Sequence, residues 1–478
     1  MNSNLRTPQS LQKSVPFPAT GAQRRHVRKD TLPFSCPGSW LLHAVLLIFF
    51  FCILLSDADA LNVNRTVLPN GLTVLHSENH SLPIVMLTLI VKGGQVHEPD
   101  AKAGLANLTA ELLTEGTKNR TSRDISEEID FIGASLDASA GNDFTTISLS
   151  VLKKDIQKGA ELFSDILLNP TFPQVEIDRK KELISGSLKQ REEEPSFLAG
   201  RAFRQEVFGE HPYGRLPEGS PESLRDITQE DLARFHKEYF RPNNSILSVA
   251  GDLTNAELQE LIQRYLDGWK KADVSERKTG RLKREMIRKT IKIDKDLTQA
   301  NIILGNLGIS RHDPDYYAVL VMNYILGGGG FSSRLMSSVR DKMGLAYDVH
   351  SYFSANNEEG AFQVGLQTKN ESANTAISEV LQQIERIRKE EVSNEEISEA
   401  KSYLTGSFPR RLDTSRKIAD FLASVEFFHL GLDYATKYPE YINAVTKEDV
   451  RRVAKKYLTP EYYILVVVAD QKKAELKY

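Results

Sequence analysis

The feature that most constrains the fold of this 478-residue chain is an internal repeat. Residues 227–252 and 445–470 share 11 identical residues over 26 aligned positions, at an offset of 218 residues. In both copies a threonine, Thr228 or Thr446, stands three residues before an aspartate, and a proline then precedes a run rich in β-branched residues. This order predicts a capped helix followed by a strand in each copy, and therefore two similar halves.

A second match supports a tandem duplication, because residues 176–188 resemble residues 396–408 at an offset of 220. Each half opens with strand patterns and continues with amphipathic helices, so we expect an α+β fold with helices packed on a mostly antiparallel sheet. The strands expected to open the halves are 72–76 and 84–91, and 290–293 and 300–305. The predicted organisation is an N-terminal domain over 61–267, a charged, solvated linker over 268–289 and a C-terminal domain over 290–478, forming a clamshell.

Residues 1–60 have the pattern of a targeting segment. A basic cluster at 24–29 precedes an apolar run at 40–55, which is followed by the small-residue sequence Asp-Ala-Asp-Ala at 57–60. This order is typical of a secretory signal peptide cleaved before Leu61, or of an uncleaved N-terminal membrane anchor. We therefore expect an exported protein, periplasmic or extracellular, that contacts the membrane only through this segment.

The composition argues against a nucleic-acid-binding protein. Lys and Arg total 61 and Asp and Glu total 64, a formal net charge of −3, so the basic excess typical of nucleic-acid binders is missing. Hydrophobic residues make up 40% and charged residues 26%, as in a soluble globular protein. Both cysteines, Cys36 and Cys52, lie in the targeting segment, so a buried core must stabilise the exported part without disulfides.

The first segment with a candidate chemical role is GLANLTAELLTEGT, residues 104–117. It resembles the metal-binding helix of the pitrilysin/insulinase family of zinc metallopeptidases, which includes mitochondrial processing peptidase. In that family the helix carries His-x-x-Glu-His between an upstream glycine and a downstream Gly-Thr. Two histidines four residues apart share a helix face and bind zinc, while the glutamate takes a proton from the metal-bound water.

The ligands that this resemblance implies are replaced here. The two histidine positions hold Asn107 and Glu111, the base position holds Ala110, and the family's third ligand, a glutamate, corresponds to Ser187. One carboxylate cannot hold a catalytic zinc, which normally has three protein ligands. We therefore expect a non-catalytic member of the family, with no metal or other cofactor in this chain.

The remaining histidines do not suggest a metal site. His76 and His80 are four residues apart, but they fall in a strand and turn pattern, where their side chains would not converge. The others are scattered singly. His211 opens the sequence His-Pro-Tyr-Gly at 211–214, which matches a loop common in the family and supports the resemblance without implying a role.

The strongest signal lies in residues 326–353, where LGGGGFSSRL is followed by Arg340 and then by Gly-Leu-Ala-Tyr ending at Tyr347. The glycines lack a following Gly-Lys-Ser/Thr, which excludes a P-loop and favours close passage past a neighbour or a bound peptide. In the pitrilysin/insulinase family an arginine and a tyrosine seven positions apart contact substrate at the metal site. The resemblance thus implies that Arg340 and Tyr347 bind substrate, because a guanidinium and a phenol can hold a peptide carbonyl. A surface arginine and a packed strand tyrosine remain the alternative.

Three functions stay open. The favoured one is a non-catalytic, substrate-binding subunit of a heteromeric zinc metalloendopeptidase, paired with a paralogue that carries the zinc and acting on extended peptides. The second is a structural or assembly protein, like the core subunits of the respiratory cytochrome bc1 complex. The third is an autonomous peptidase with an atypical metal site. An assembly protein would not need Arg340 and Tyr347, and an autonomous enzyme would need ligands that this chain lacks.

Overall fold

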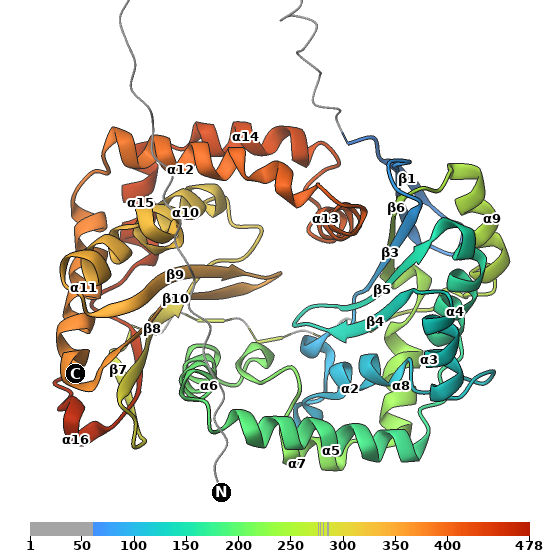
Figure 1. Cartoon of the computed structure of the whole chain (residues 1–478), viewed down its shortest axis with the longest axis horizontal. Helices are drawn as coiled ribbons and strands as arrows, with labels where there is room; N and C mark the ends of the chain where they lie inside the picture. Colours follow the sequence, from blue (N-terminus) through green and yellow to red (C-terminus); the bar gives the residue numbers. More distant parts are fainter. Residues whose placement is uncertain (1–60, 276, 278, 281, 284–285) are drawn as a thin grey trace, which may run out of the picture. The chain divides into compact units, whose positions relative to one another are not determined.

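The structure is a computed structural model that describes residues 61–478, apart from residues 276, 278, 281, 284 and 285. The predicted targeting segment and both cysteines lie outside the described residues. The described residues belong to one compact unit, Ala60–Tyr478, drawn in Figure 1. None of the helices in this described part combines the length and the apolarity needed to span a bilayer.

The N-terminal half is built on a six-stranded sheet with the order β1-β2-β6-β3-β5-β4. Neighbouring strands are antiparallel except for the pair β2 and β6. The strands are β1 (Asn64–Val67), β2 (Thr73–Glu78), β3 (Ile84–Val91), β4 (Ser135–Ala140), β5 (Thr145–Leu152) and β6 (Ser245–Gly251). The helices are α2 (Leu105–Leu112), α3 (Ser122–Phe131), α4 (Ile156–Leu168), α5 (Gln174–Arg191), α6 (Pro195–Phe208), α7 (Pro221–Asp226), α8 (Gln229–Tyr239) and α9 (Asn255–Tyr265).

The C-terminal half repeats this plan on a five-stranded sheet with the order β7-β11-β8-β10-β9, in which β7 and β11 are the parallel pair. The strands are β7 (Lys289–Asp294), β8 (Gln299–Leu307), β9 (Ala346–Ala355), β10 (Glu359–Lys369) and β11 (Ile464–Ala469). The helices are α10 (Tyr316–Asn323), α11 (Ala373–Lys389), α12 (Asn394–Gly406), α13 (Ser415–Phe427), α14 (Tyr434–Ala444), α15 (Lys447–Tyr457) and α16 (Gln471–Ala474). The α+β fold of two similar halves with mostly antiparallel sheets is confirmed.

The repeated segments form the same local structure in both halves. The Thr228 hydroxyl accepts a hydrogen bond from the backbone N–H of Asp231 at the start of α8, and Thr446 does the same with Asp449 at the start of α15. These capping boxes satisfy backbone donors that the first turn of a helix leaves without partners. The strands that follow, β6 and β11, are buried along their whole length, and each lies between two other strands of its sheet.

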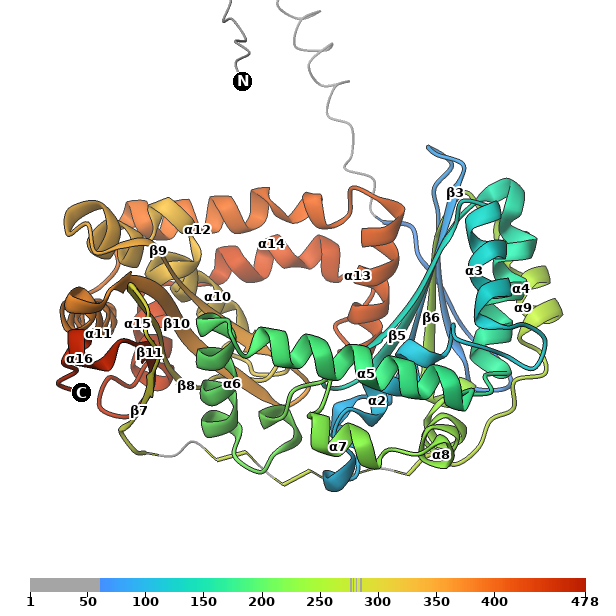
Figure 2. The ribbon, with the colours of Figure 1, turned by 60° about the horizontal axis from the view of Figure 1, so that its bottom comes forward.

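Each half covers one face of the other half's sheet with a helix. From the C-terminal half, α13 packs Ile418, Leu422 and Phe427 against the apolar side chains of β2, β3 and β6. From the N-terminal half, α6 packs Leu198 and Phe203 against β8 and β11. Figures 1 and 2 show α13 beside the N-terminal sheet and α6 beside the C-terminal one. This exchange buries apolar surface from both halves in the same two clusters, so the halves of the clamshell share core.

The segment predicted as a solvated linker is partly anchored. Leu282 is only 9% exposed and packs in the α6 cluster. Arg277 forms an ion pair with Asp100 at 2.7 Å, and the Thr279 hydroxyl donates to the carboxylate of Glu358. The high charge of the segment led us to expect that it is solvated. Its composition did not indicate that a few apolar and hydroxyl side chains, such as Leu282 and Thr279, pack against the two halves.

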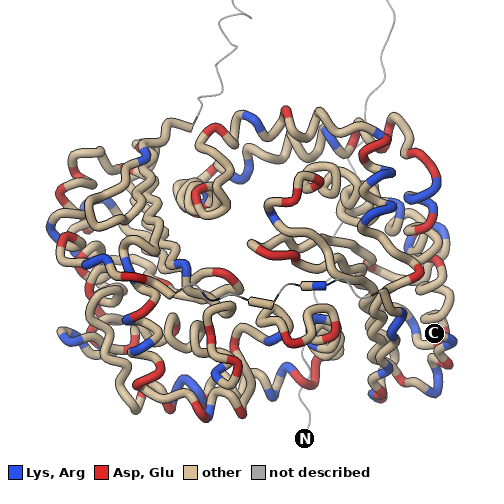
Figure 3. Tube along the Cα trace, turned by 180° about the vertical axis from the view of Figure 1, so that it is seen from behind, with Lys and Arg blue, Asp and Glu red and all other residues tan. Residues whose placement is uncertain are grey.

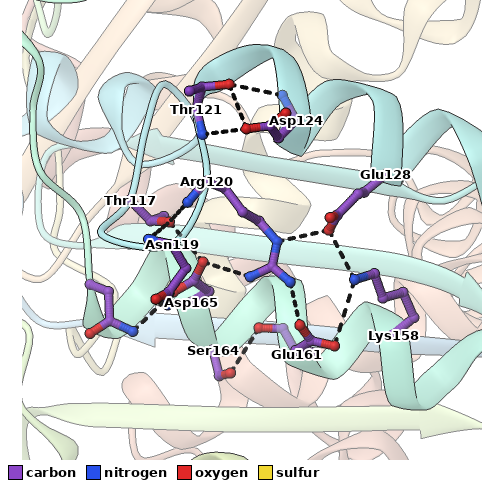
Figure 4. Close-up of polar contacts among 11 residues, drawn as sticks. Thr117, Asn119, Arg120, Thr121, Asp124, Glu128, Lys158, Glu161, Ser164 and Asp165 are labelled. Atoms are coloured by element: carbon purple, nitrogen blue, oxygen red, sulfur yellow. Dashed lines mark hydrogen bonds and ion pairs between the residues drawn. The ribbon is translucent and has the colours of Figure 1, made fainter.

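Charged residues of both signs are interspersed along the described chain (Figure 3), and one group surrounds Arg120 in the loop after α2 (Figure 4). The Arg120 guanidinium contacts three carboxylates, those of Glu128 and Asp165 at 2.8 Å and that of Glu161. Lys158 adds a second cation, 3.0 Å from Glu128. The network ties the loop after α2 to α3 and α4.

Candidate functional site

The helix that resembles a metal-binding helix is α2, and a buried carboxylate holds its first turn. Glu98, which is 0% exposed, accepts hydrogen bonds from the backbone N–H groups of Gly104 (3.1 Å) and Ala106 (2.8 Å). Burial raises the pKa of Glu98 to about 8, while the two donors favour its anion. The backbone of α2 therefore forms the helix that the resemblance implies. The differences from the family's metal-binding helix lie in its side chains.

The side chains at the family's ligand positions pair with one another. The Asn107 amide donates to the Glu111 carboxylate at 2.9 Å, and Ala110 is fully buried. Lys180 of α5 places its ammonium 3.6 Å from Glu111 and 3.1 Å from Glu115. The positive charge beside the remaining carboxylate thus comes from a lysine, and a second cation there would be repelled.

The positions implied by the resemblance do not form a metal site. Ser187 is exposed on α5 and offers a neutral hydroxyl where the family has a carboxylate. Across the described ranges, no group of three or more His, Cys, Asp or Glu side chains is placed to hold a metal ion. The residues present here therefore do not fit a catalytic zinc.

The spaced histidines His76 and His80 also point to separate partners. His76 lies in β2, is buried and contacts the carbonyl of Leu253 at 2.9 Å. His80 follows the strand and contacts the carboxylate of Asp252 at 2.6 Å. The two rings thus take different partners, the adjacent residues Leu253 and Asp252, and the absence of a metal there stays a prediction.

Arg340 and Tyr347 are brought together at the start of β9. Arg340 lies in a π-helical segment, Met336–Lys342, and its guanidinium carbon is 5.5 Å from the centre of the Tyr347 ring and 4.7 Å from that of Phe331. Both rings are largely exposed, Tyr347 to 87% and Phe331 to 70%. A guanidinium at this distance is attracted to the face of an aromatic ring. One of its nitrogens also lies 3.7 Å from the carboxylate of Asp341.

The glycine-rich segment before Arg340 packs against the protein itself. A Cβ atom on Gly327 would lie 2.7 Å from the backbone nitrogen of Ser351 in β9, so a larger residue would displace the strand. Gly328 and Gly329 are similarly close to Asn323 and Tyr324. The sequence predicted that these glycines pass close to a neighbouring segment or to a bound peptide. The structure shows close neighbouring segments, which are β9 and the helical turn before the glycines.

A cavity of about 940 Å³ opens beside Tyr347, over one face of the C-terminal sheet. Its floor is rich in carboxamide side chains from β8 and β10, namely Gln299, Asn301, Gln363 and Gln367. A carboxamide both donates and accepts hydrogen bonds, as a peptide group does. These carboxamides can therefore match the backbone of an extended peptide, while Asp348, His350 and Lys369 add ionisable groups to the lining.

Sequence reasoning identified Arg340 and Tyr347 but missed three features of this region. Phe331 was noted only as part of a motif. Its contact with Arg340 was missed because a spacing of nine residues does not indicate that two side chains share a helix face. Lys180 was not singled out, because a cation next to a lost metal site is visible only in three dimensions. The third feature is the set of carboxamides on β8 and β10. Their alternate positions along each strand could have predicted that they share one face of the sheet.

Comparisons with known proteins agree with this picture. Residues 73–216 match the model described as "Insulinase (Peptidase family M16)", and residues 226–404 match the model described as "Peptidase M16 inactive domain". An "Uncharacterized zinc protease" of Rickettsia bellii is 29% identical over 343 residues, covering 72% of this chain and 82% of the relative.

Two solved structures extend the likeness. The crystal structure of a peptidase M16 inactive domain from Pseudomonas fluorescens superposes with a TM-score of 0.80 at 28% identity, covering 86% of this chain and 98% of that one. A chain of complex III2 from Candida albicans shares the fold, with a TM-score of 0.72 at 17% identity, covering 87% of this chain and 98% of that one. The family models span both halves, and the chain belongs to the insulinase family of peptidases, family M16.

Proposed function

We propose that this chain is the non-catalytic, substrate-binding subunit of a heteromeric zinc metalloendopeptidase. Its partner is a paralogue that carries the zinc and the catalytic glutamate. Arg340 and Tyr347 bind the peptide substrate next to the partner's metal site, and the cavity beside Tyr347 receives an extended part of that peptide. The pattern of the predicted targeting segment supports a location outside the cytoplasm, in the periplasm or beyond, with the chain either released or anchored by its N-terminus.

One contrast carries the proposal. Every zinc ligand of the family is replaced on α2 and α5, and the one carboxylate left, Glu111, is paired with Lys180. By contrast, Arg340 lies 5.5 Å from the ring of Tyr347, and Tyr347 lines an open cavity that contains four carboxamide side chains. A tyrosine that is 87% exposed beside a guanidinium leaves its hydroxyl available to bind another molecule, which supports a contact with substrate.

The proposal assigns simple chemistry to this chain's own residues. The guanidinium of Arg340 offers a planar fork of N–H donors to a peptide carbonyl or carboxylate, and the Tyr347 hydroxyl adds one more donor. The carboxamides of the cavity floor pair with backbone groups farther along the peptide. Metal-dependent cleavage is left to the partner.

The test is a double substitution in the reconstituted pair. Arg340→Ala with Tyr347→Phe is expected to lower kcat/KM for peptide cleavage by about tenfold or more, the effect of losing oriented donors. Binding to the partner and the thermal midpoint should not change. The matched control is Arg123→Ala with Tyr403→Phe, which alters an arginine and a tyrosine that are exposed elsewhere, and it should leave activity as in the wild type. Wild-type turnover by the Arg340/Tyr347 variant would refute the substrate role.

A scaffold role is the second candidate, and the fold shared with a complex III chain favours it. A scaffold subunit would bind its partner with either pair of substitutions and would show no peptidase activity in any mixture. The same reconstitution therefore separates the two candidates. A stable complex without activity supports the scaffold, and activity that depends on Arg340 and Tyr347 supports the substrate-binding subunit.

A further inference from the structure

The tip of the β9–β10 hairpin is held by residues from the N-terminal half. Asp143, in the turn between β4 and β5, accepts a hydrogen bond from the backbone N–H of Asn357 at 3.0 Å. The Tyr213 hydroxyl donates to the same Asp143 carboxylate and accepts from the backbone N–H of Glu358 at 3.4 Å. Two consecutive backbone donors of the tip are therefore bound by side chains far away in the sequence.

His211 adds a further contact to the tip. Its Nδ1 accepts from the backbone N–H of Tyr213 at 3.2 Å, so Nε2 carries the proton and donates it to the Glu358 carboxylate at 3.1 Å. Thr279 donates to the other oxygen of that carboxylate. Three segments thus converge on the hairpin tip: the β4–β5 turn, the His-Pro-Tyr-Gly loop at 211–214 and the segment that joins the halves.

These side chains are buried deeply enough to fix geometry. Tyr213 is 0% exposed, His211 7% and Asp143 8%. Burial raises the pKa of Asp143 and of Tyr213 and lowers that of His211. A buried polar group without its partner is costly, so the network tolerates little displacement of the tip.

The same loop is joined directly to a wall of the cavity. Helix α6 ends at Phe208, three residues before His211, and its first turns place Ser196 and Gly200 over one side of the cavity. On the floor, β9 contributes His350 and Tyr352. Within the described residues, β9 pairs with β10 alone. Asn323 donates to the Ser351 carbonyl in the middle of β9 at 3.1 Å, and the tip network adds a second anchor at the end of the strand.

We propose that His211, Tyr213 and Asp143 are positioning residues that hold the β9–β10 hairpin against α6 and thereby set the width of the substrate cavity. This assigns a role to the His-Pro-Tyr-Gly loop. The contact itself stands on the structure alone, and only its effect on substrate rests on the function proposed above.

Hydrogen exchange tests the contact without any activity. Tyr213→Phe removes one hydroxyl, and the amides of β9 and β10 are expected to exchange about tenfold faster because a buried hydrogen bond is lost. The matched control is Tyr438→Phe. Tyr438 is also 0% exposed, and its hydroxyl finds no hydrogen-bond partner among the described residues, so exchange should stay as in the wild type. Strands β3 and β5 should be unaffected in both variants.

Kinetics of the reconstituted pair test the positioning role, with an unfolded, dye-labelled casein as substrate. Tyr213→Phe should raise KM severalfold and leave kcat within about twofold, because Arg340 and Tyr347 are untouched. Unchanged exchange in β9 and β10 would overturn the contact as a constraint. Faster exchange with a wild-type KM would overturn the positioning role. An inactive wild-type pair would count against the proposed function instead, and exchange would still decide the contact.

A milder variant keeps the test decisive if Tyr213→Phe does not fold. Glu358→Gln keeps the size of the side chain and removes the charge that pairs with His211. In Glu358→Gln we expect the amides of β9 and β10 to exchange faster and KM to rise, both by less than in Tyr213→Phe. Wild-type values of both would contradict the proposal.

Discussion

Replacing Leu422 by alanine tests whether the two halves fold as one unit. Leu422 belongs to the C-terminal half, yet it is 1% exposed against the N-terminal sheet. Leucine to alanine removes about three carbon groups at roughly 0.8 kcal/mol each, and the cavity left behind adds to this. We expect the free energy of unfolding to fall by about 3 kcal/mol, and we expect the unfolding transitions of both halves to shift together.

A single tryptophan makes the assay specific. Without the first 60 residues the chain retains Trp269 alone, because the other tryptophan is Trp40. Trp269 is 5% exposed in the core of the N-terminal half. In urea, its fluorescence transition should move to lower denaturant in Leu422→Ala, together with the far-ultraviolet circular dichroism.

Leu183→Ala is the control, since this leucine is 55% exposed on α5 and its loss should cost less than about 0.5 kcal/mol. The reasoning fails if the Trp269 transition of Leu422→Ala stays at the wild-type midpoint while the circular dichroism shifts. That result would mean that the halves unfold separately and that α13 contributes nothing to the N-terminal sheet.

Three further predictions concern charge. Arg120→Ala removes the cation shared by three carboxylates and should cost about 3–5 kcal/mol, whereas Arg123→Ala, on an exposed pair, should cost less than about 0.5 kcal/mol in the same urea assay. Burial lowers the pKa of His97 and of His236 to about 4, so the unfolded state binds more protons below about pH 6.5. The two histidines should therefore lower stability between about pH 6.5 and pH 4, by up to about 3 kcal/mol each. Together they outweigh the opposite effect of Glu98, whose raised pKa favours the folded state as the pH falls. A flat urea midpoint across this range would contradict the assignment. The fourfold variant that restores the family's ligands carries Asn107→His, Ala110→Glu, Glu111→His and Ser187→Glu. It should take up zinc more readily than it regains turnover, because surrounding groups that orient the ligands are also missing, and adding Lys180→Ala should tighten zinc binding at least about tenfold. Metal analysis that finds no zinc in either variant would show that the four positions are not equivalent to the family's ligands.

Helix starts and strands could be predicted from the sequence where a short local pattern is specific to one type of structure. Thr228 and Thr446 predicted helix starts because a hydroxyl three residues before an aspartate completes a capping box, and both helices begin there. The strand expected at 84–91 is β3 with the same bounds. Internal repetition then predicted the second sheet from the first.

Long-range packing could not be predicted in the same way. The apolar face of α13 predicts burial, but its periodicity does not say which sheet will cover it. The sequence of the His-Pro-Tyr-Gly loop likewise gave no sign that Tyr213 reaches Asp143 and a hairpin far along the chain. In the candidate site, Arg340 and Tyr347 came from a resemblance, whereas the pairing of Lys180 with Glu111 required the structure.

The central claim is that this chain supplies substrate contacts to a zinc-bearing partner. The most direct measurement is the zinc content and peptidase activity of the purified chain, first alone and then mixed with that paralogue. We predict no zinc and no activity in the chain alone, and activity on mixing above that of the paralogue by itself. Bound zinc with activity in the lone chain, or a stable complex no more active than the paralogue alone, would contradict the account.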